Sequence, residues 1–305
     1  MNQQRISNQY EVELHNQILK LFHKSDLRMH DNILGSKVYT NYQRVALIVL
    51  FQRSRKAPRD FVSELKESRW VRWIGLREIP NFTTLSRWIK KFNMSKLRQF
   101  LTKTVSEEKP SLMAIDATGF DSWQRSRHYE RRLRDFKVRN PHLPYAKADI
   151  LVDTNNKLIY DVVLRMKPRH DTLGASTIIK RLKHKHVLIL ADRGYDSEPL
   201  HELVAKSGNL MFAPIRDFRV RKIKGKHRRR CEEGHIFYSQ RNIVESVNFS
   251  LKSRFRSLRS KLHFMKKREF MWKVITYNLE KLSQRVNSLL RLIFQLLFCN
   301  RAKFK

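Results

Sequence analysis

The spacing of apolar residues along the chain changes near residue 106. Before that point apolar side chains recur at helical intervals, in amphipathic runs at 42–51, 59–70 and 83–100 that Gly and Pro residues separate. This first part shows no strand-like alternation of apolar and polar positions. The pattern therefore predicts an all-α N-terminal domain over residues 1–106.

After residue 106 short apolar runs alternate with helical segments. The pattern predicts strands at 112–116, 148–153, 158–164, 187–190 and 210–213, and helices at 172–183 and 198–206. The second and third strands flank Thr154-Asn155-Asn156-Lys157, whose composition is typical of a hairpin turn. Strands that alternate with helices indicate an α/β sheet, which we expect residues 107–280 to form.

The C-terminal segment 281–305 is predicted to be a helix that packs within the protein or forms a dimer contact. Its apolar stretch, 289–299, is interrupted by Arg291 and Gln295 and falls well short of the ~20 residues that span a bilayer. The polar N-terminal stretch does not resemble a signal peptide, and the two cysteines allow one disulfide at most. We therefore expect a cytoplasmic protein without a membrane segment.

Net charge narrows the class of partner. The 305 residues include 64 Lys plus Arg against 28 Asp plus Glu, which gives a formal charge of +36. An excess this large predicts nucleic acid as the partner rather than a small-molecule substrate. Hydrophobic residues still make up 41% of the chain, so the sequence predicts a folded protein and excludes a basic disordered tail.

A basic, aromatic helix is predicted within residues 81–92, which begin with capping residues. If this is the second helix of a helix-turn-helix, Arg87, Lys90 and Lys91 would face DNA. The same segment also fits a surface helix held in a bundle by four apolar residues, namely Leu85, Trp88, Ile89 and Phe92. Periodicity does not choose between these interpretations.

Two predicted strands end in a carboxylate, Asp116 and Asp192, and a later helix carries Glu245. In an open α/β sheet ligands bind at the carboxyl ends of the strands, where these acids can converge. Three converging carboxylates repel each other unless divalent cations lie between them, and their hard oxygens prefer Mg²⁺ or Mn²⁺. Two such ions roughly 4 Å apart can activate an attacking hydroxyl and stabilise a leaving oxygen, so the acids predict phosphoryl transfer on DNA.

Taken singly, each acid also has an ordinary structural interpretation. Asp116 and Asp192 suit turn residues at strand ends, and Glu245 suits any helix. The neighbours of Glu245 favour a functional interpretation. Spacings of three, four and seven residues return four side chains to one helical face: Tyr238, Arg241, Glu245 and Lys252.

Three segments together resemble the signatures of DDE transposases of the insertion-sequence four/five group. They are Asp116-Ala117-Thr118-Gly119-Phe120, Asp192-Arg193-Gly194-Tyr195 and Tyr238-x2-Arg241-x3-Glu245-x6-Lys252. The third segment matches at all four defining positions and at their spacings. The resemblance covers about residues 112–277, and the N-terminal helices are only generally similar.

The resemblance implies an RNase H-like mixed sheet with flanking helices, in which Asp116, Asp192 and Glu245 bind two Mg²⁺ or Mn²⁺ ions. It also implies that the protein binds terminal inverted repeats, that water cleaves the transposon end, and that the freed 3′-hydroxyl attacks target DNA. Tyr238, Arg241 and Lys252 would contact the terminal phosphates and flanking bases. Synapsis of two ends implies a homodimer on DNA, in the nucleoid of a prokaryotic cell.

Two further basic segments are expected to contact DNA. Residues 216–230 hold nine Lys or Arg and one Asp, which predicts a short strand and a mobile basic loop in place of a large all-β insertion. The arginines of that loop expected on DNA are Arg228, Arg229 and Arg230. A solvated charge run is the alternative. Residues 252–273 are expected to continue the helix of Glu245 along the duplex.

Several alternatives stay open. Trp123 suits base stacking or, as we expect, packing. His170 and Asp171 lie either near the metals or, as we expect, at the start of the next helix, with Asp171 or Thr172 as its cap. Two alternatives to a transposase also stay open: an RNase H-like metal-dependent nuclease or resolvase without strand transfer, and a domesticated relative that binds DNA without activity.

Overall fold

The computed structural model describes residues 2–31, 37–120, 146–167, 170–216, 223–255 and 258–299, with side chains from 9 to 289 within these ranges. By its internal contacts the chain divides into two units. The first is formed by Met1–Thr104 together with Trp272–Lys305, and the second by Val105–Met271.

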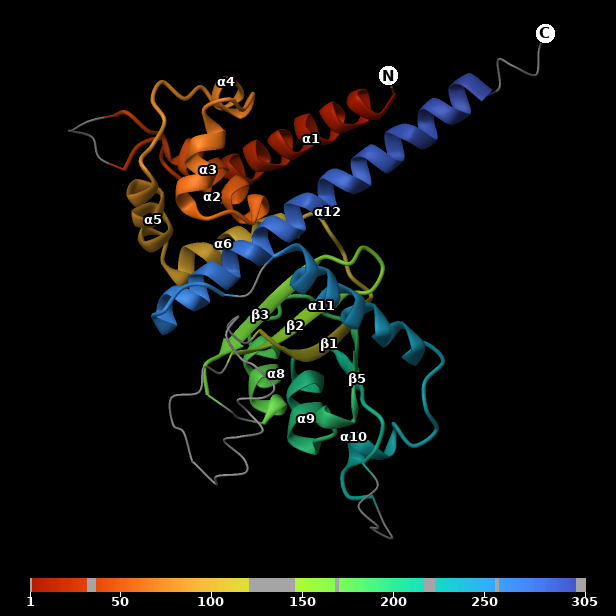
Figure 1. Cartoon of the computed structure of the whole chain (residues 1–305). Coiled ribbons are helices and arrows are strands. Elements are labelled where there is room, and N and C mark those ends of the chain that lie inside the picture. Colours follow the sequence, from red (N-terminus) through yellow and green to blue (C-terminus); the bar gives the residue numbers. More distant parts are fainter. Residues whose placement is uncertain are drawn as a thin grey trace, which may run out of the picture. The chain divides into compact units, whose positions relative to one another are not determined.

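The described part of the first unit is built from helices (Figure 1). They are α1 (Asn2–Lys24), α2 (Asn41–Ser54), α3 (Pro58–Leu65), α4 (Trp70–Trp73), α5 (Phe82–Lys91), α6 (Met94–Thr104) and α12 (His263–Cys299) from Trp272 onward. The expected helical N-terminal region is confirmed. None of the helices that the structure describes is long and apolar enough to cross a membrane.

The predicted run at 83–100 is two helices rather than one. Phe92 is extended, and the Asn93 side chain accepts a hydrogen bond from the Lys96 N–H at 2.9 Å, which caps α6. The apolar face of α5 is buried, as the bundle interpretation requires, at Leu85, Trp88, Ile89 and Phe92. Sequence periodicity continues across this break because both helices bury residues in the same core.

The C-terminal helix α12 packs with the N-terminal helices from Trp272 onward. The buried Trp272 ring lies 5.4 Å from Phe92 and 5.7 Å from Phe100, measured between ring centroids. Asn278 donates a buried hydrogen bond to Thr104 at 2.9 Å. The chain thus returns to the first unit at Trp272. The C-terminal element was expected to begin later, at residue 281.

The second unit contains a mixed five-stranded sheet (Figure 1). Its strands are β1 (Leu112–Gly119), β2 (Lys147–Asp153), β3 (Ile159–Arg165), β4 (Leu188–Ala191) and β5 (Leu210–Phe212), in the order β3-β2-β1-β4-β5. β2 runs antiparallel to β1 and β3, whereas β4 runs parallel to β1 and β5. The expected RNase H-like α/β class and the predicted β2–β3 hairpin are confirmed.

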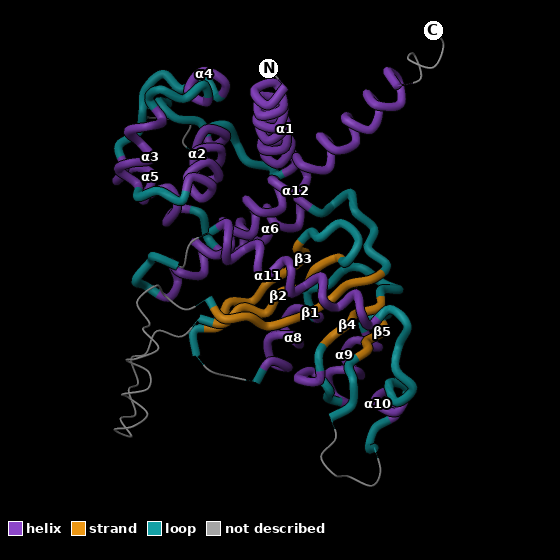
Figure 2. The backbone as a smooth tube through the Cα atoms, turned by 45° about the vertical axis from the view of Figure 1, so that its right-hand side comes forward, coloured by secondary structure: helices purple, strands orange, loops and turns teal. Residues whose placement is uncertain are grey.

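Helices cover both faces of this sheet (Figures 1 and 2). The described helical segments are α8 (Asp171–Ile179), η1 (Arg193–Tyr195), α9 (Glu198–Lys206), α10 (Lys226–Arg229), η2 (Tyr238–Arg241) and α11 (Asn242–Arg254). α11 packs on β1 and β2, and α8 packs on β2 and β3. Asp116 pairs with Ile150 and Ala117 with Asp149, so strand alternation turns Asp116 toward α11 and Asp149 toward α8.

Two expectations about helix ends are wrong. The N-cap of α8 is His170, whose ring nitrogen accepts from the Thr172 N–H at 3.4 Å, rather than Asp171 or Thr172. Residues 252–273 do not continue the helix of Glu245. That helix, α11, ends at Arg254 because the next residue, Phe255, is extended and buried.

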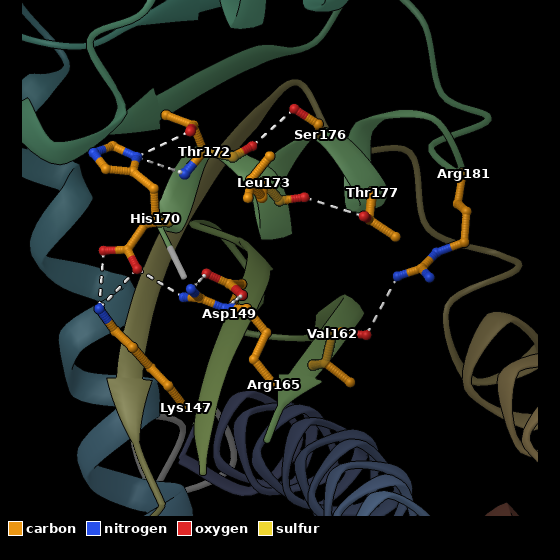
Figure 3. Close-up of polar contacts among 11 residues, drawn as sticks. Lys147, Asp149, Val162, Arg165, His170, Thr172, Leu173, Ser176, Thr177 and Arg181 are labelled. Atoms are coloured by element: carbon orange, nitrogen blue, oxygen red, sulfur yellow. Dashed lines mark hydrogen bonds and ion pairs between the residues drawn. The ribbon is translucent and has the colours of Figure 1, made fainter. Parts of the chain in front are cut away.

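A buried ionic network fixes α8 to the sheet (Figure 3). Asp149 is fully buried and accepts two hydrogen bonds from the Arg165 guanidinium, at 2.7 and 2.8 Å. Arg165 also donates to Asp171 at 2.7 Å, as does Lys147 at 2.7 Å. A Cβ on Gly174 would lie 2.0 Å from the Asp149 carboxylate, so only glycine allows this approach. Burial raises the pKa of Asp149 to about 6, against the opposing charge of Arg165.

This network predicts that Arg165→Leu lowers the free energy of unfolding of the second unit by about 3–5 kcal/mol, because Asp149 stays buried without its counter-ion. Urea denaturation measures the change. The control is Arg181→Leu, which breaks a more exposed pair with Asp161 (2.7 Å) and should cost about 1 kcal/mol or less. Equal losses of unfolding free energy in both variants would contradict a special role for the buried Arg165–Asp149 pair.

Candidate active site

The parallel pairing of β1 and β4 brings Asp116 and Asp192 together. Ile115 is paired with Ala191, so the next residue on each strand is one of the two acids. Asp192 directly follows β4, as predicted, but Asp116 lies inside β1 rather than at its end. β1 continues to Gly119 because it still pairs with the longer β2 on its other side.

The segment after Asp192 holds its carboxylate in place. Asp192 accepts a hydrogen bond from the Gly194 N–H at 2.7 Å and caps η1. A Cβ on Gly194 would lie 2.7 Å from the same carboxylate oxygen. The third residue of the segment, Tyr195, is fully buried, and burial raises the pKa of its hydroxyl. Each residue type in Asp-x-Gly-aromatic thus has a local structural cause.

The helix α11 contacts the Asp116 carboxylate. Asp116 is half-buried and accepts a hydrogen bond from the Asn248 amide at 3.0 Å. Burial raises the pKa of Asp116; Arg241 opposes this rise, whereas Asp192 and Glu245 add to it. The charges of Arg241, Asp192 and Glu245 thus all act on the Asp116 carboxylate.

Asn248 is a site residue that the sequence analysis missed. It is buried, and its amide oxygen has no hydrogen-bond partner among the residues that the structure describes. Its position three residues after Glu245, on a helix expected to face the acids, was the available signal. A buried amide next to Asp116 becomes recognisable only once α11 is known to lie on β1.

The predicted four-residue face spans two helical segments. Tyr238 and Arg241 begin and end η2, and Glu245 and Lys252 lie on α11. The Tyr238 ring packs edge-on against Phe212, with centroids 5.3 Å apart, and burial raises the pKa of Tyr238. The Lys252 ammonium is exposed and lies 5.7 Å from the Phe120 ring centroid.

The Glu245 carboxylate is paired with a cation in this structure. Glu245 forms an ion pair with the Arg241 guanidinium, and its side chain is 54% exposed whereas that of Arg241 is 15% exposed. Within the described ranges no three His, Cys, Asp or Glu side chains are grouped closely enough to hold a metal ion. The structure therefore brings Asp116 and Asp192 together, with Glu245 beside them and paired to a cation.

The donor chemistry of this site nevertheless fits a hard divalent cation. Asp116, within β1, and Asp192, directly after β4, offer carboxylate oxygens at the same level of two adjacent strands, which suits Mg²⁺ or Mn²⁺. The unpartnered Asn248 oxygen beside Asp116 can accept a hydrogen bond from a metal-bound water.

The other predicted DNA contacts are in two separate places. Arg87, Lys90 and Lys91 are exposed on α5 of the first unit, where Lys91 pairs with Asp31. In the second unit, the short helix α10 and the residue after it carry the three arginines of the basic loop: Arg228, Arg229 and Arg230.

Arg228 differs from its two neighbours. Its guanidinium makes two contacts of 2.6 Å with the buried Asp196 carboxylate, whereas Arg229 and Arg230 are exposed. Arg228 thus fixes the basic segment to the residues that follow η1. The segment is partly helical rather than a loop throughout. Trp123 lies outside the described residues, and so do 217–222 of this segment.

The order of the five strands, with helices on both faces of the sheet, gives the RNase H-like fold of DDE transposases, a class of phosphoryl-transfer enzymes. The chain belongs to the family described as Transposase DDE domain, whose model matches residues 107–279. Enzymes of this family transfer phosphoryl groups and typically use divalent metals.

Two comparisons add relatives of this chain. An uncharacterised protein of Aquifex aeolicus (strain VF5) is 22% identical over 234 residues, which are 72% of this chain and 70% of that protein. A solved structure of the piggyBac transposase synaptic complex with hairpin DNA is 11% identical. That match covers 90% of this chain and 77% of the other, with a TM-score of 0.45.

The contact between Gly194 and Asp192 predicts an energetic coupling. Gly194→Ala should lower the free energy of unfolding by about 1–3 kcal/mol, because the new Cβ displaces the carboxylate. In an Asp192→Ala background the same change should cost at least about 1 kcal/mol less. A double-mutant cycle in urea measures the coupling, and additive effects would contradict the geometry.

Proposed function

We propose that the protein is the transposase of an insertion sequence of the four/five group. It binds terminal inverted repeats, cleaves the DNA ends with divalent metals and joins the freed 3′-hydroxyl to target DNA. The observation that carries this proposal is the register of β1 and β4, which sets Asp116 beside Asp192 next to the helix of Glu245. The formal charge of +36 supports DNA as the substrate.

Asp116, Asp192 and Glu245 would hold two Mg²⁺ or Mn²⁺ ions. Bound metals supply activation of the attacking oxygen and stabilisation of the leaving oxygen. Glu245 is the exposed member of the set, and its carboxylate is paired with the Arg241 guanidinium. A DNA phosphate competes with Glu245 for the guanidinium, since arginine binds carboxylate and phosphate in the same geometry. End binding thereby frees Glu245 for the metal site.

DNA is held by three groups of side chains in this proposal. Tyr238, Arg241 and Lys252 lie along η2 and α11 and contact the phosphates and bases at the cut. Arg87, Lys90 and Lys91 on α5 contact the inverted repeat, and Arg228, Arg229 and Arg230 form a third group. Arg229 and Arg230 reach the backbone, while Arg228 anchors them through Asp196. Synapsis of two ends requires a homodimer on DNA.

Removing any metal-binding acid should abolish Mg²⁺-dependent cleavage of an inverted-repeat DNA end. Asp116→Ala, Asp192→Ala and Glu245→Ala should each lose at least about a hundredfold in rate, since the metals supply several kcal/mol of transition-state stabilisation. The control is Glu202→Ala, which removes an exposed helical glutamate on α9. A triad variant that binds DNA and keeps full activity would overturn the proposal.

Strand transfer separates transposase from nuclease. Incubation of a pre-cut end with a supercoiled target plasmid should give joined products with the unchanged protein. Cleavage without joining would support the nuclease or resolvase alternative, and DNA binding without either reaction would support an inactive, domesticated relative.

Arg241→Ala and Lys252→Ala should weaken end binding without loss of metal binding. Each removes a phosphate contact, so the slope of log affinity against log salt should fall by about one. Lys206→Ala on α9 removes an exposed cation elsewhere and should leave the slope unchanged. Fluorescence anisotropy measures binding, and calorimetry with Mn²⁺ measures the metal. Weaker Mn²⁺ binding by Arg241→Ala would contradict its role as a competitor for Glu245.

A further inference from the structure

A large aromatic side chain is exposed next to the candidate active site without an assigned role. Phe249 lies on α11 and is 73% exposed. It follows Glu245 by four residues and precedes Lys252 by three, so it shares their helical surface. The neighbouring Val247, Asn248 and Leu251 are buried and hold the helix on the sheet.

Phe249 is distinct among the exposed apolar residues. Only three of the large exposed apolar residues in the described ranges are aromatic: Phe237, Phe249 and Phe264. The Phe237 ring contacts His235 with centroids 5.6 Å apart, and the Phe264 ring lies 5.2 Å from the Arg268 guanidinium. Phe249 makes no ring contact with any residue that the structure describes, so its flat surface is open to a ligand.

The surroundings of Phe249 favour nucleic acid over a protein partner. Lys252 lies three residues after Phe249 on α11, and lysine is depleted from protein interfaces. The formal charge of +36 favours a partner that carries phosphates. An aromatic ring among cations is the arrangement that binds single-stranded nucleic acid, where rings stack on bases and cations contact phosphates.

Distance along the helix sets which base can be reached. Four residues of α-helix rise about 6 Å, so Phe249 stands less than two base steps of about 3.4 Å from Glu245 along the axis. A base beside the phosphate that is cut becomes available when the end of the duplex opens, because a paired base has both faces covered by its neighbours.

We propose that Phe249 stacks on an unpaired base one or two nucleotides from the phosphate that is cut and so positions the strand in the active site. The inference rests on the proposed function of the same site and adds the class of ligand, an unpaired nucleobase. Phe249 is then a substrate-positioning residue that takes no part in the chemistry.

The test compares two synthetic DNA probes of the same sequence. One is fully paired, and the other ends in a mismatched fork that carries 2-aminopurine among its unpaired bases. Binding to the full-length chain is measured in EDTA, so that neither metal nor cleavage contributes. Phe249→Ala should bind the forked probe about 5- to 100-fold more weakly, leave affinity for the paired probe unchanged and abolish the quenching of 2-aminopurine.

Two further variants make the comparison specific. Phe249→Trp should retain the forked-probe affinity and the quenching, because indole stacks as benzene does. Leu173→Ala removes an exposed apolar side chain from α8, on the opposite face of the sheet, and should change neither probe.

Three outcomes would overturn the proposal. The first is an equal loss of affinity for both probes in Phe249→Ala, and the second is no loss of affinity for the forked probe. The third is a dimer that forms without DNA and dissociates in Phe249→Ala, as measured by sedimentation, because Phe249 would then belong to a protein interface. Since no cleavage is measured, these outcomes are independent of the acid-to-alanine variants that test the proposed function.

Discussion

The parallel pairing of β1 with β4 is the constraint on which the rest of the site depends. Four consecutive residue pairs, from Leu112 with Leu188 to Ile115 with Ala191, fix the relative height of the two strands. A slip of one residue would move Asp116 to the other face of the sheet. The contacts from Gly194 and Asn248 then hold the two carboxylates that this register brings to the same level.

One face of the sheet carries a structural ion-pair network, and the other face carries the candidate active site. On one face Asp149, Arg165 and Asp171 form a buried network that fixes α8 against β2 and β3. On the other face α11 supplies Asn248 to Asp116 and keeps Glu245 and Phe249 exposed. A charge buried behind the sheet is costly unless it is paired, and Arg165 supplies the pair for Asp149.

The fold was largely predictable from the sequence because its strands are short apolar runs between turn residues. The helix at 198–206 and the hairpin around 154–157 were predicted within one residue of their observed ends. Asp116 was placed at a strand end because apolar periodicity stops there, although pairing with β2 carries β1 on to Gly119. Helix breaks at Phe92 and Phe255 were missed because both residues are apolar and buried, which periodicity interprets as continuation.

Within the site, residue types were predictable and their contacts were not. Spacing placed Tyr238, Arg241, Glu245 and Lys252 on one face, but only the structure shows that Arg241 holds Glu245. Asn248 and Asp149 were missed because their roles depend on which face of the sheet each side chain enters. Arg228 belonged to a basic segment by composition, whereas its pair with Asp196 joins residues far apart in the chain.

The most direct test of a metal site at Asp116 and Asp192 is the binding of Mn²⁺ to the full-length chain, measured by electron paramagnetic resonance with and without a bound DNA end. Mn²⁺ binding should strengthen when DNA takes Arg241 from Glu245, and it should be lost in Asp116→Ala and Asp192→Ala. Mn²⁺ binding that is unchanged in both aspartate variants would contradict a metal site built on the register of β1 and β4.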